Sequence, residues 1–145
     1  MVRDARLVPS SKVREETVMS MTKPELRALV ERYFAAVDAK DLEATLANYT
    51  ADCCIRAETA GVQHTGRDTE IRDMLERMFK QCETIWHGEF HHVADSAAGT
   101  IASQFLYRSV ALDGTRLEDR NCNIARVEDG RFSAISVYMA QNTLT

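Results

Sequence analysis

The chain has 145 residues, which is enough for one ordinary domain and too few for two. Charged residues make up 28% of it and hydrophobic residues 45%, as in globular proteins, and the net charge of -4 argues against a nucleic-acid-binding surface. No apolar stretch is long enough to span a membrane, and residues 1–20 lack the apolar centre of a signal peptide. We therefore expect a cytoplasmic protein that binds neither nucleic acid nor membranes.

The first ordered element is expected after an N-terminal segment, residues 1–21, that has the composition of a flexible arm or a short leading helix. Residues 22–145 are interpreted as one domain. Thr22 and Glu25 have the spacing of a capping box, with a proline between them in the first turn. Apolar residues then recur at helical spacing from Leu26 to Val37, which predicts an amphipathic helix.

Two shorter elements and another helix follow. Asp41 is placed to cap a short second helix. Residues 53–58 alternate between apolar and polar side chains and predict a half-buried strand, with residues 62–65 as its return strand. After a glycine, residues 67–82 place their apolar side chains on one face of a third helix.

The rest of the chain has the periodicity of strands. Residues 84–94, 100–112, 115–127 and 131–141 predict four strands, and two Asp-Gly pairs supply hairpin turns between them. Helices followed by hairpin-linked strands predict an α+β fold, in which three N-terminal helices pack on a curved, mainly antiparallel sheet.

The four cysteines have neither the spacing of a zinc site nor that of a CxxC pair. Cys53 and Cys54 are adjacent, and neighbouring strand residues point to opposite faces, so they do not readily bond to each other. We expect four reduced thiols. No nucleotide-binding glycine motif is present either, and we expect no metal and no cofactor.

Three segments carry a family resemblance: residues 31–43 (ERYFAAVDAKDLE), 64–71 (HTGRDTEI) and 127–132 (VEDGRF). With the order of elements, they resemble the nuclear-transport-factor-like superfamily over about residues 22–141, in particular SnoaL-like polyketide cyclases, ketosteroid isomerases and scytalone dehydratases. The resemblance implies a cone-shaped fold around an apolar pocket and a homodimer formed through the open face of the sheet. The domain of residues 22–145 is accordingly interpreted as SnoaL-like.

The resemblance to ketosteroid isomerases implies three site positions. Their helix tyrosine falls on Tyr33, which could donate a hydrogen bond to a developing oxyanion. Their aspartate base falls on Ala57, which cannot take a proton, so the usual isomerase route is not expected. Their protonated aspartic acid falls on Asn123, whose amide is a ready donor. Tyr33 and Asn123 are equally compatible with structural roles.

Histidines offer a second route to acid–base chemistry. His87 and His91 alternate onto one face of the predicted strand 84–94, and His87 best matches the catalytic histidine of scytalone dehydratases. Imidazole suits proton transfer at neutral pH. Both histidines are candidate catalytic residues, although surface or structural roles stay open.

The apolar wall of the pocket is predicted from inward positions on the first and last strands: Ile55, Ala57, Val137 and Met139. Alternation in strand 100–112 leaves two possibilities. Either the face with Gln104 and Arg108 lines the cavity, or the face with Phe105 and Tyr107 does.

The leading functional hypothesis is a small-molecule enzyme without a cofactor: an isomerase, cyclase or dehydratase acting by acid–base chemistry on a lipophilic compound with a carbonyl or phenol group. The alternative is a non-catalytic domain of the same fold that binds a small ligand or assembles as a dimer. The missing carboxylate at Ala57 favours the alternative, whereas Tyr33 and Asn123 favour an enzyme.

Overall fold

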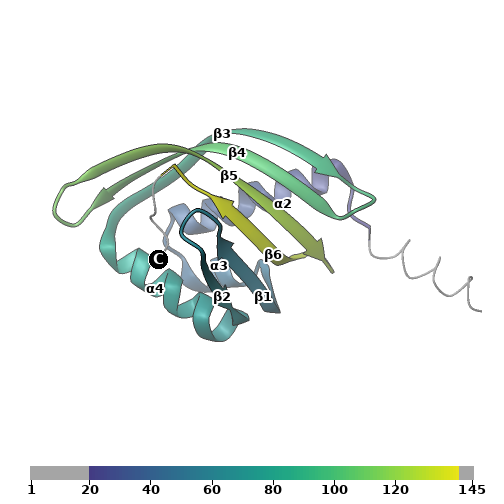
Figure 1. Ribbon diagram of the computed structural model, residues 1–145, viewed down its shortest axis with the longest axis horizontal. Helices are drawn as coiled ribbons and strands as arrows, with labels where there is room; N and C mark the ends of the chain where they lie inside the picture. Colours follow the sequence, from purple (N-terminus) through teal and green to yellow (C-terminus); the bar gives the residue numbers. More distant parts are fainter. Residues whose placement is uncertain (1–19, 141–145) are drawn as a thin grey trace, which may run out of the picture.

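The computed structural model describes residues 20–140, so residues 1–19 of the predicted arm lie outside it. A strongly curved sheet arches over the helices (Figure 1). The elements, in chain order, are α2 (Lys23–Asp38), α3 (Leu42–Leu46), β1 (Tyr49–Ala57), β2 (Val62–Thr65), the π-helical turn η1 (Gly66–Ile71), α4 (Arg72–Gln81), β3 (Cys82–Asp95), β4 (Thr100–Ala111), β5 (Arg116–Glu128) and β6 (Arg131–Tyr138). No helix within residues 20–140 combines the length and the apolar character needed to cross a membrane.

Helix α2 begins as its sequence predicts. The Thr22 hydroxyl accepts a hydrogen bond from the Glu25 backbone N–H at 3.2 Å, and the Glu25 carboxylate accepts one from the Thr22 N–H at 2.8 Å. This capping box satisfies donors that a helix start otherwise leaves unpaired. The predicted apolar stripe of α2 is buried, and it packs chiefly against β3.

The third predicted helix is divided in the structure. Its first part is the π-helical turn η1, and regular α-helix begins only at Arg72. Gly66 opens the turn with φ +99°, where a Cβ would lie 2.3 Å from the Thr69 hydroxyl. Position 66 therefore requires glycine both for its backbone angle and for the close approach of Thr69.

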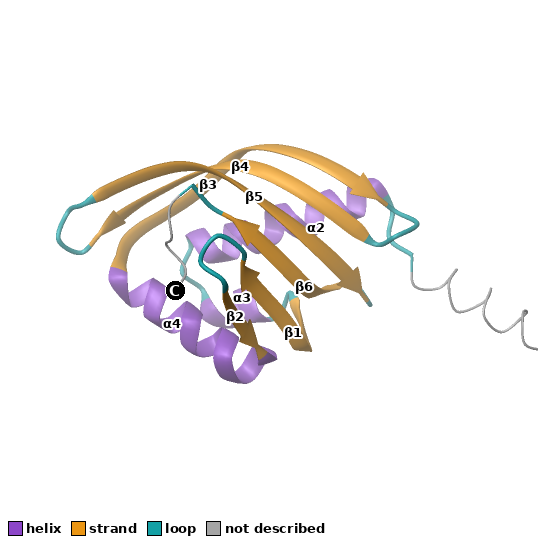
Figure 2. Ribbon diagram, in the orientation of Figure 1, coloured by secondary structure: helices purple, strands orange, loops and turns teal. Residues whose placement is uncertain are grey.

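The six strands lie in the order β2-β1-β6-β5-β4-β3 (Figure 2). The predicted hairpins β3–β4, β4–β5 and β5–β6 are present, and so is the antiparallel β1–β2 pair. The pairing of β1 with β6 is parallel and joins the first strand to the last. No local sequence signal predicts that pairing, because nearly the whole domain lies between its partners. The mainly antiparallel α+β fold is confirmed.

A bulge interrupts β3 and changes which side chains face the helices. The register of β3 against β4 shifts between Gly88 and His91, and Glu89 has a positive φ of 54°. Beyond this point Phe90 faces inward, whereas His91 is exposed. The expectation that His87 and His91 share a face was wrong, because the extra residue of a bulge inverts the alternation that follows it.

Strain at Glu89 yields a testable prediction. A β-branched side chain is strongly disfavoured at positive φ, so Glu89→Val should lower the free energy of unfolding by about 1–2 kcal/mol in urea denaturation. Glu118→Val is a matched control, because Glu118 is also an exposed, ion-paired strand residue but is not among the residues with positive φ. Equal losses in the two variants would contradict the argument from strain.

Candidate active site

One apolar cavity lies between the inner face of the sheet and helices α2 and α4. Its volume is about 50 Å³, which holds a few water molecules. The lining residues are Tyr33, Phe34, Val37, Ile55, Met74, Leu75, Met78, His87, Phe105, Tyr107, Asn121, Asn123, Ile135, Val137 and Met139. Three of them are methionines, whose unbranched side chains adapt readily to a guest.

His87 is fixed in the cavity wall by a carboxylate. Its ring Nδ1 lies 2.6 Å from Asp38 Oδ1, and its backbone N–H donates to Asp38 Oδ2 at 2.9 Å. The imidazole is stacked on Phe34, with 4.2 Å between ring centroids and 24° between ring planes. The side chain is only 8% exposed, so the ring is held in one position at the edge of an apolar space.

When Asp38 is ionised, this contact determines which ring nitrogen of His87 carries the hydrogen. A carboxylate can only accept hydrogen bonds, so Nδ1 carries the hydrogen that lies between His87 and Asp38. In the neutral ring, Nε2 is then left with a lone pair and is the nitrogen available to a ligand. A histidine held in this way is equipped to accept a proton from a bound molecule.

Tyr33 reaches the same cavity from α2. The Tyr49 hydroxyl donates to the Tyr33 hydroxyl at 2.7 Å, which leaves the hydrogen of Tyr33 free to point at a ligand. Burial raises the pKa of Tyr33 to about 12, and the hydrogen bond from Tyr49 lowers it in part. Tyr33 therefore remains a neutral donor at physiological pH.

Two asparagines on the inner face of β5 complete the polar part of the cavity. The Asn121 side-chain oxygen accepts a hydrogen bond from the Ala140 N–H at 3.2 Å, which holds the chain end beside the cavity. Asn123 is 9% exposed, and its Oδ1 makes no hydrogen bond within the described residues. An amide left in this way retains the capacity to bind a ligand.

Most of the sequence-predicted site residues meet at this cavity. Tyr33, Asn123 and His87 line it, and so do three of the predicted apolar positions, Ile55, Val137 and Met139. Ala57 is buried opposite Val137 in the sheet but forms no part of the cavity wall. His91 is exposed and does not reach the cavity, because the bulge turns it outward.

The two candidate faces of β4 are now distinguished. Phe105 and Tyr107 are buried and line the cavity. Arg108 lies on the outer face, where it pairs with Glu118 at 2.6 Å and covers the ring of Trp86 at 5.0 Å. Arg108 is therefore not available to bind a ligand inside the cavity.

Asp38 is the residue of this candidate site that was not predicted from the sequence. It is the last residue of α2, one helical turn after the cavity residue Phe34, and no basic residue accompanies it in that turn. A negative charge at the C-terminal end of a helix is unfavourable unless it has a partner. Its position on the apolar stripe of α2 was the available signal. No sequence signal predicted the bulge in β3 that places His87 opposite Asp38.

The four cysteines are free thiols, as expected. Within residues 20–140, no group of three or more His, Cys, Asp or Glu side chains is arranged to hold a metal ion.

The buried phenol of Tyr33 predicts a loss of stability at alkaline pH. An unfolded tyrosine loses its proton near pH 10, whereas the folded state retains that of Tyr33 up to about pH 12. Between these values the unfolded chain binds fewer protons, so the free energy of unfolding falls as pH rises. In urea denaturation from pH 9 to 11.5, Tyr33→Phe should remove part of this fall, on the order of 1–2 kcal/mol. An unchanged slope would contradict the assignment.

Sequence and structure comparisons agree with this architecture. A family model described as a SnoaL-like domain matches residues 30–135, and no curated protein matches the chain. Similar solved structures include a proposed polyketide cyclase from Xanthomonas campestris pv. campestris, with 18% identity over 80% of this chain and 90% of that chain and a TM-score of 0.71. A proposed isomerase from Bacillus subtilis has 13% identity, 82% and 89% coverage and a TM-score of 0.72. AusH from Aspergillus nidulans has 17% identity, 84% and 88% coverage and a TM-score of 0.72.

Proposed function

This chain belongs to the SnoaL-like family, and from that premise we propose that it is an acid–base enzyme for a lipophilic small molecule that carries a carbonyl or phenol group. An isomerase, cyclase or dehydratase reaction fits this chemistry. The observation that carries the proposal is the His87–Asp38 pair, held at 2.6 Å in the wall of an apolar cavity that also contains Tyr33 and Asn123.

In this mechanism, His87 replaces the carboxylate that is missing at Ala57. His87 Nε2 takes a proton from the carbon next to the reacting carbonyl, and the electron pair of the broken C–H bond moves onto the carbonyl oxygen to give an enolate. Asp38 stabilises the imidazolium that forms. The same Nε2 then returns the proton to another atom of the substrate, which closes the cycle without a cofactor.

Tyr33 and Asn123 are proposed to bind the oxygen on which the charge develops. The Tyr33 hydroxyl and the Asn123 amide are neutral donors, so neither group has to gain or lose a proton of its own to act. Donors that are already oriented inside an apolar cavity stabilise an oxyanion more than water does. The cavity is too small for a ring system as it stands, and we expect the side chains of Met74, Met78 and Met139 to move aside when one binds.

Ligand binding is the first prediction of this proposal. In a thermal-shift screen of aromatic ketones, polycyclic phenols and steroids, a true ligand at about 100 times its Kd should stabilise by about 2.7 kcal/mol, which is roughly 5–10 °C. The shift should shrink in Tyr33→Phe/Asn123→Leu and persist in His91→Gln, which alters an exposed histidine on the same strand as His87. Equal shifts in all three proteins would remove Tyr33 and Asn123 from the site.

Turnover tests the role of the histidine. For a bound compound that the wild type converts, Asp38→Asn should lower kcat by about 10²- to 10⁴-fold, because an amide stabilises the imidazolium poorly and favours the other ring tautomer. Glu43→Gln is the control, since that carboxylate is exposed and pairs with Arg72 at 2.9 Å. Binding without conversion of any compound would favour the non-catalytic ligand-binding alternative.

We also propose that the protein forms a homodimer through the outer face of the sheet. Three strands of this face carry large side chains with exposed apolar surface: Trp86, Ile124 and Tyr138 are 40%, 43% and 46% exposed. Ile124→Glu should shift a dimer to monomer in equilibrium sedimentation. A wild type that stays monomeric at high concentration would contradict this part of the proposal.

A further inference from the structure

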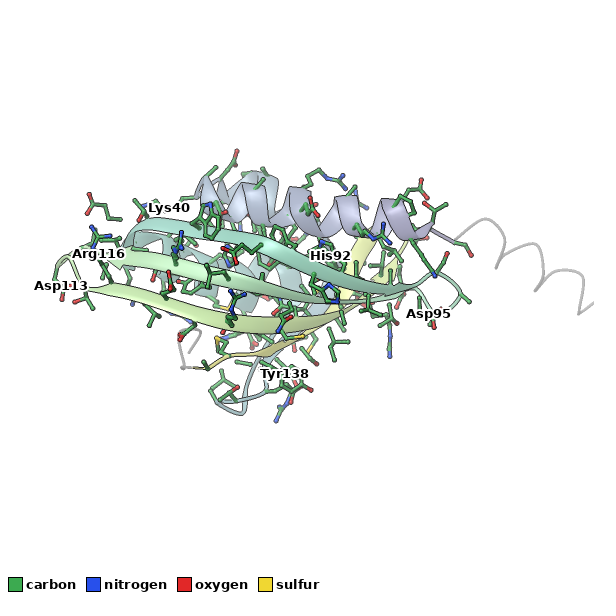
Figure 3. The ribbon with its side chains drawn as sticks, turned by 90° about the horizontal axis from the view of Figure 1, so that it is seen from above. Lys40, His92, Asp95, Asp113, Arg116 and Tyr138 are labelled. Atoms are coloured by element: carbon green, nitrogen blue, oxygen red, sulfur yellow. The ribbon has the colours of Figure 1, made fainter. Side chains whose placement is uncertain are left out.

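A second histidine–carboxylate pair lies on the same seam between α2 and β3. His92 Nε2 is 2.9 Å from Glu31 Oε2, and His92 Nδ1 is 2.8 Å from the hydroxyl of Ser103. The His92 side chain is only 6% exposed, whereas that of Glu31 is 53% exposed, so the carboxylate connects a buried ring with solvent. Figure 3 shows His92 on the sheet, toward the end opposite to Lys40.

The contacts of His92 fix its hydrogen-bonding roles. The ionised Glu31 carboxylate can only accept, so Nε2 carries a hydrogen in either charge state of the ring. In the neutral ring, Nδ1 has a lone pair and accepts the hydrogen of the Ser103 hydroxyl. In the protonated ring, Nδ1 also carries a hydrogen and donates to Ser103. Protonation of His92 therefore reverses this hydrogen bond and frees the hydrogen of Ser103.

Few other charged groups face the ring. Glu31 is the contacting group on α2, and Arg27, one turn earlier, is exposed. On β4 the neighbouring inner side chains, Ile101 and Phe105, do not titrate. Phe90 is stacked on the ring at 5.4 Å. The Glu31 carboxylate is thus the charged group that interacts with His92 when the ring is protonated.

Ser103 connects this pair to the proposed active site. Ser103 and Asn123 are opposite each other in the β4–β5 ladder, and both line a void of about 10 Å³ beside Tyr33, the size of one water molecule. Ser103 is 1% exposed. Asn123 Oδ1 is a buried acceptor without a hydrogen bond within the described residues, and Asn123 also lines the main cavity.

We propose that Glu31, His92 and Ser103 form a positioning relay that sets which end of the Asn123 amide faces the cavity. With His92 protonated, the freed Ser103 hydrogen is donated toward Asn123 Oδ1, directly or through one water, and the amide presents Nδ2–H₂ to the ligand. With His92 neutral, the Ser103 oxygen accepts from Nδ2 instead, and Oδ1 faces the ligand. The relay rests on the proposed function in one respect only, namely that the Asn123 amide donates a hydrogen bond to the ligand.

The test uses NMR of the full-length protein without any ligand, so it does not depend on turnover. The side-chain ¹⁵N–¹H₂ signals of Asn123, assigned by their loss in Asn123→Leu, are followed from pH 5 to 8 together with the ring nitrogens of His92. We expect the Asn123 signals to shift with the same midpoint as the His92 ring. Asn123 signals that do not change together with those of the His92 ring would overturn the proposed relay.

Two variants separate the relay from a general structural effect. In Ser103→Ala, the Asn123 signals should cease to follow those of the His92 ring, and continued tracking would overturn the proposal. Because Ser103 is buried, Glu31→Gln is the second variant: it changes an exposed carboxylate and should displace both midpoints together. In His87→Gln the coupling should persist, and its loss there would assign the effect to the His87–Asp38 pair instead.

Discussion

The site depends on one irregularity, the bulge at Glu89. A regular strand would place His87, Glu89 and His91 on one face, and the seam against α2 would lose either His87 or His92. The bulge lets both histidines face inward, with Phe90 between them. The Glu89 backbone adopts a positive φ at this bulge, and the surrounding sheet must offset the conformational energy that this requires. The packing of α2 on β3 thus depends on the β-bulge in β3.

The seam that results is a stack of four rings with a carboxylate at each end. His87, Phe34, Phe90 and His92 lie on one another, with centroid distances of 4.2, 5.7 and 5.4 Å. Asp38 holds the first ring and Glu31 holds the last, from positions two turns apart on α2. The two histidines differ in what lies beyond them: the cavity in one case, and the hydroxyl of Ser103 in the other. Similar pairs on one seam are therefore suited to different tasks.

The fold could be predicted from the sequence because the signals that define its elements are local. Capping at Thr22, the apolar stripe of α2 and the Asp-Gly turns each act over a few residues. The β1–β6 pairing and the bulge depend on contacts between distant segments, so the sequence carried no readable sign of them. The same division holds at the site. Tyr33 and Asn123 were placed by resemblance, whereas Asp38 acquires a role only when β3 brings His87 to the end of α2.

The end of β6 has a practical consequence for work with this protein. Met139 forms part of the cavity wall, and its backbone is held by the Thr59 hydroxyl, while the Asn121 amide holds Ala140. An affinity tag joined to the chain shortly after Ala140 would therefore begin close to the cavity wall. The start of α2 lies at the far end of that helix from Asp38 and His87. A tag joined ahead of Thr22 would begin at the other end of α2, so the two placements are not equivalent for work on the cavity.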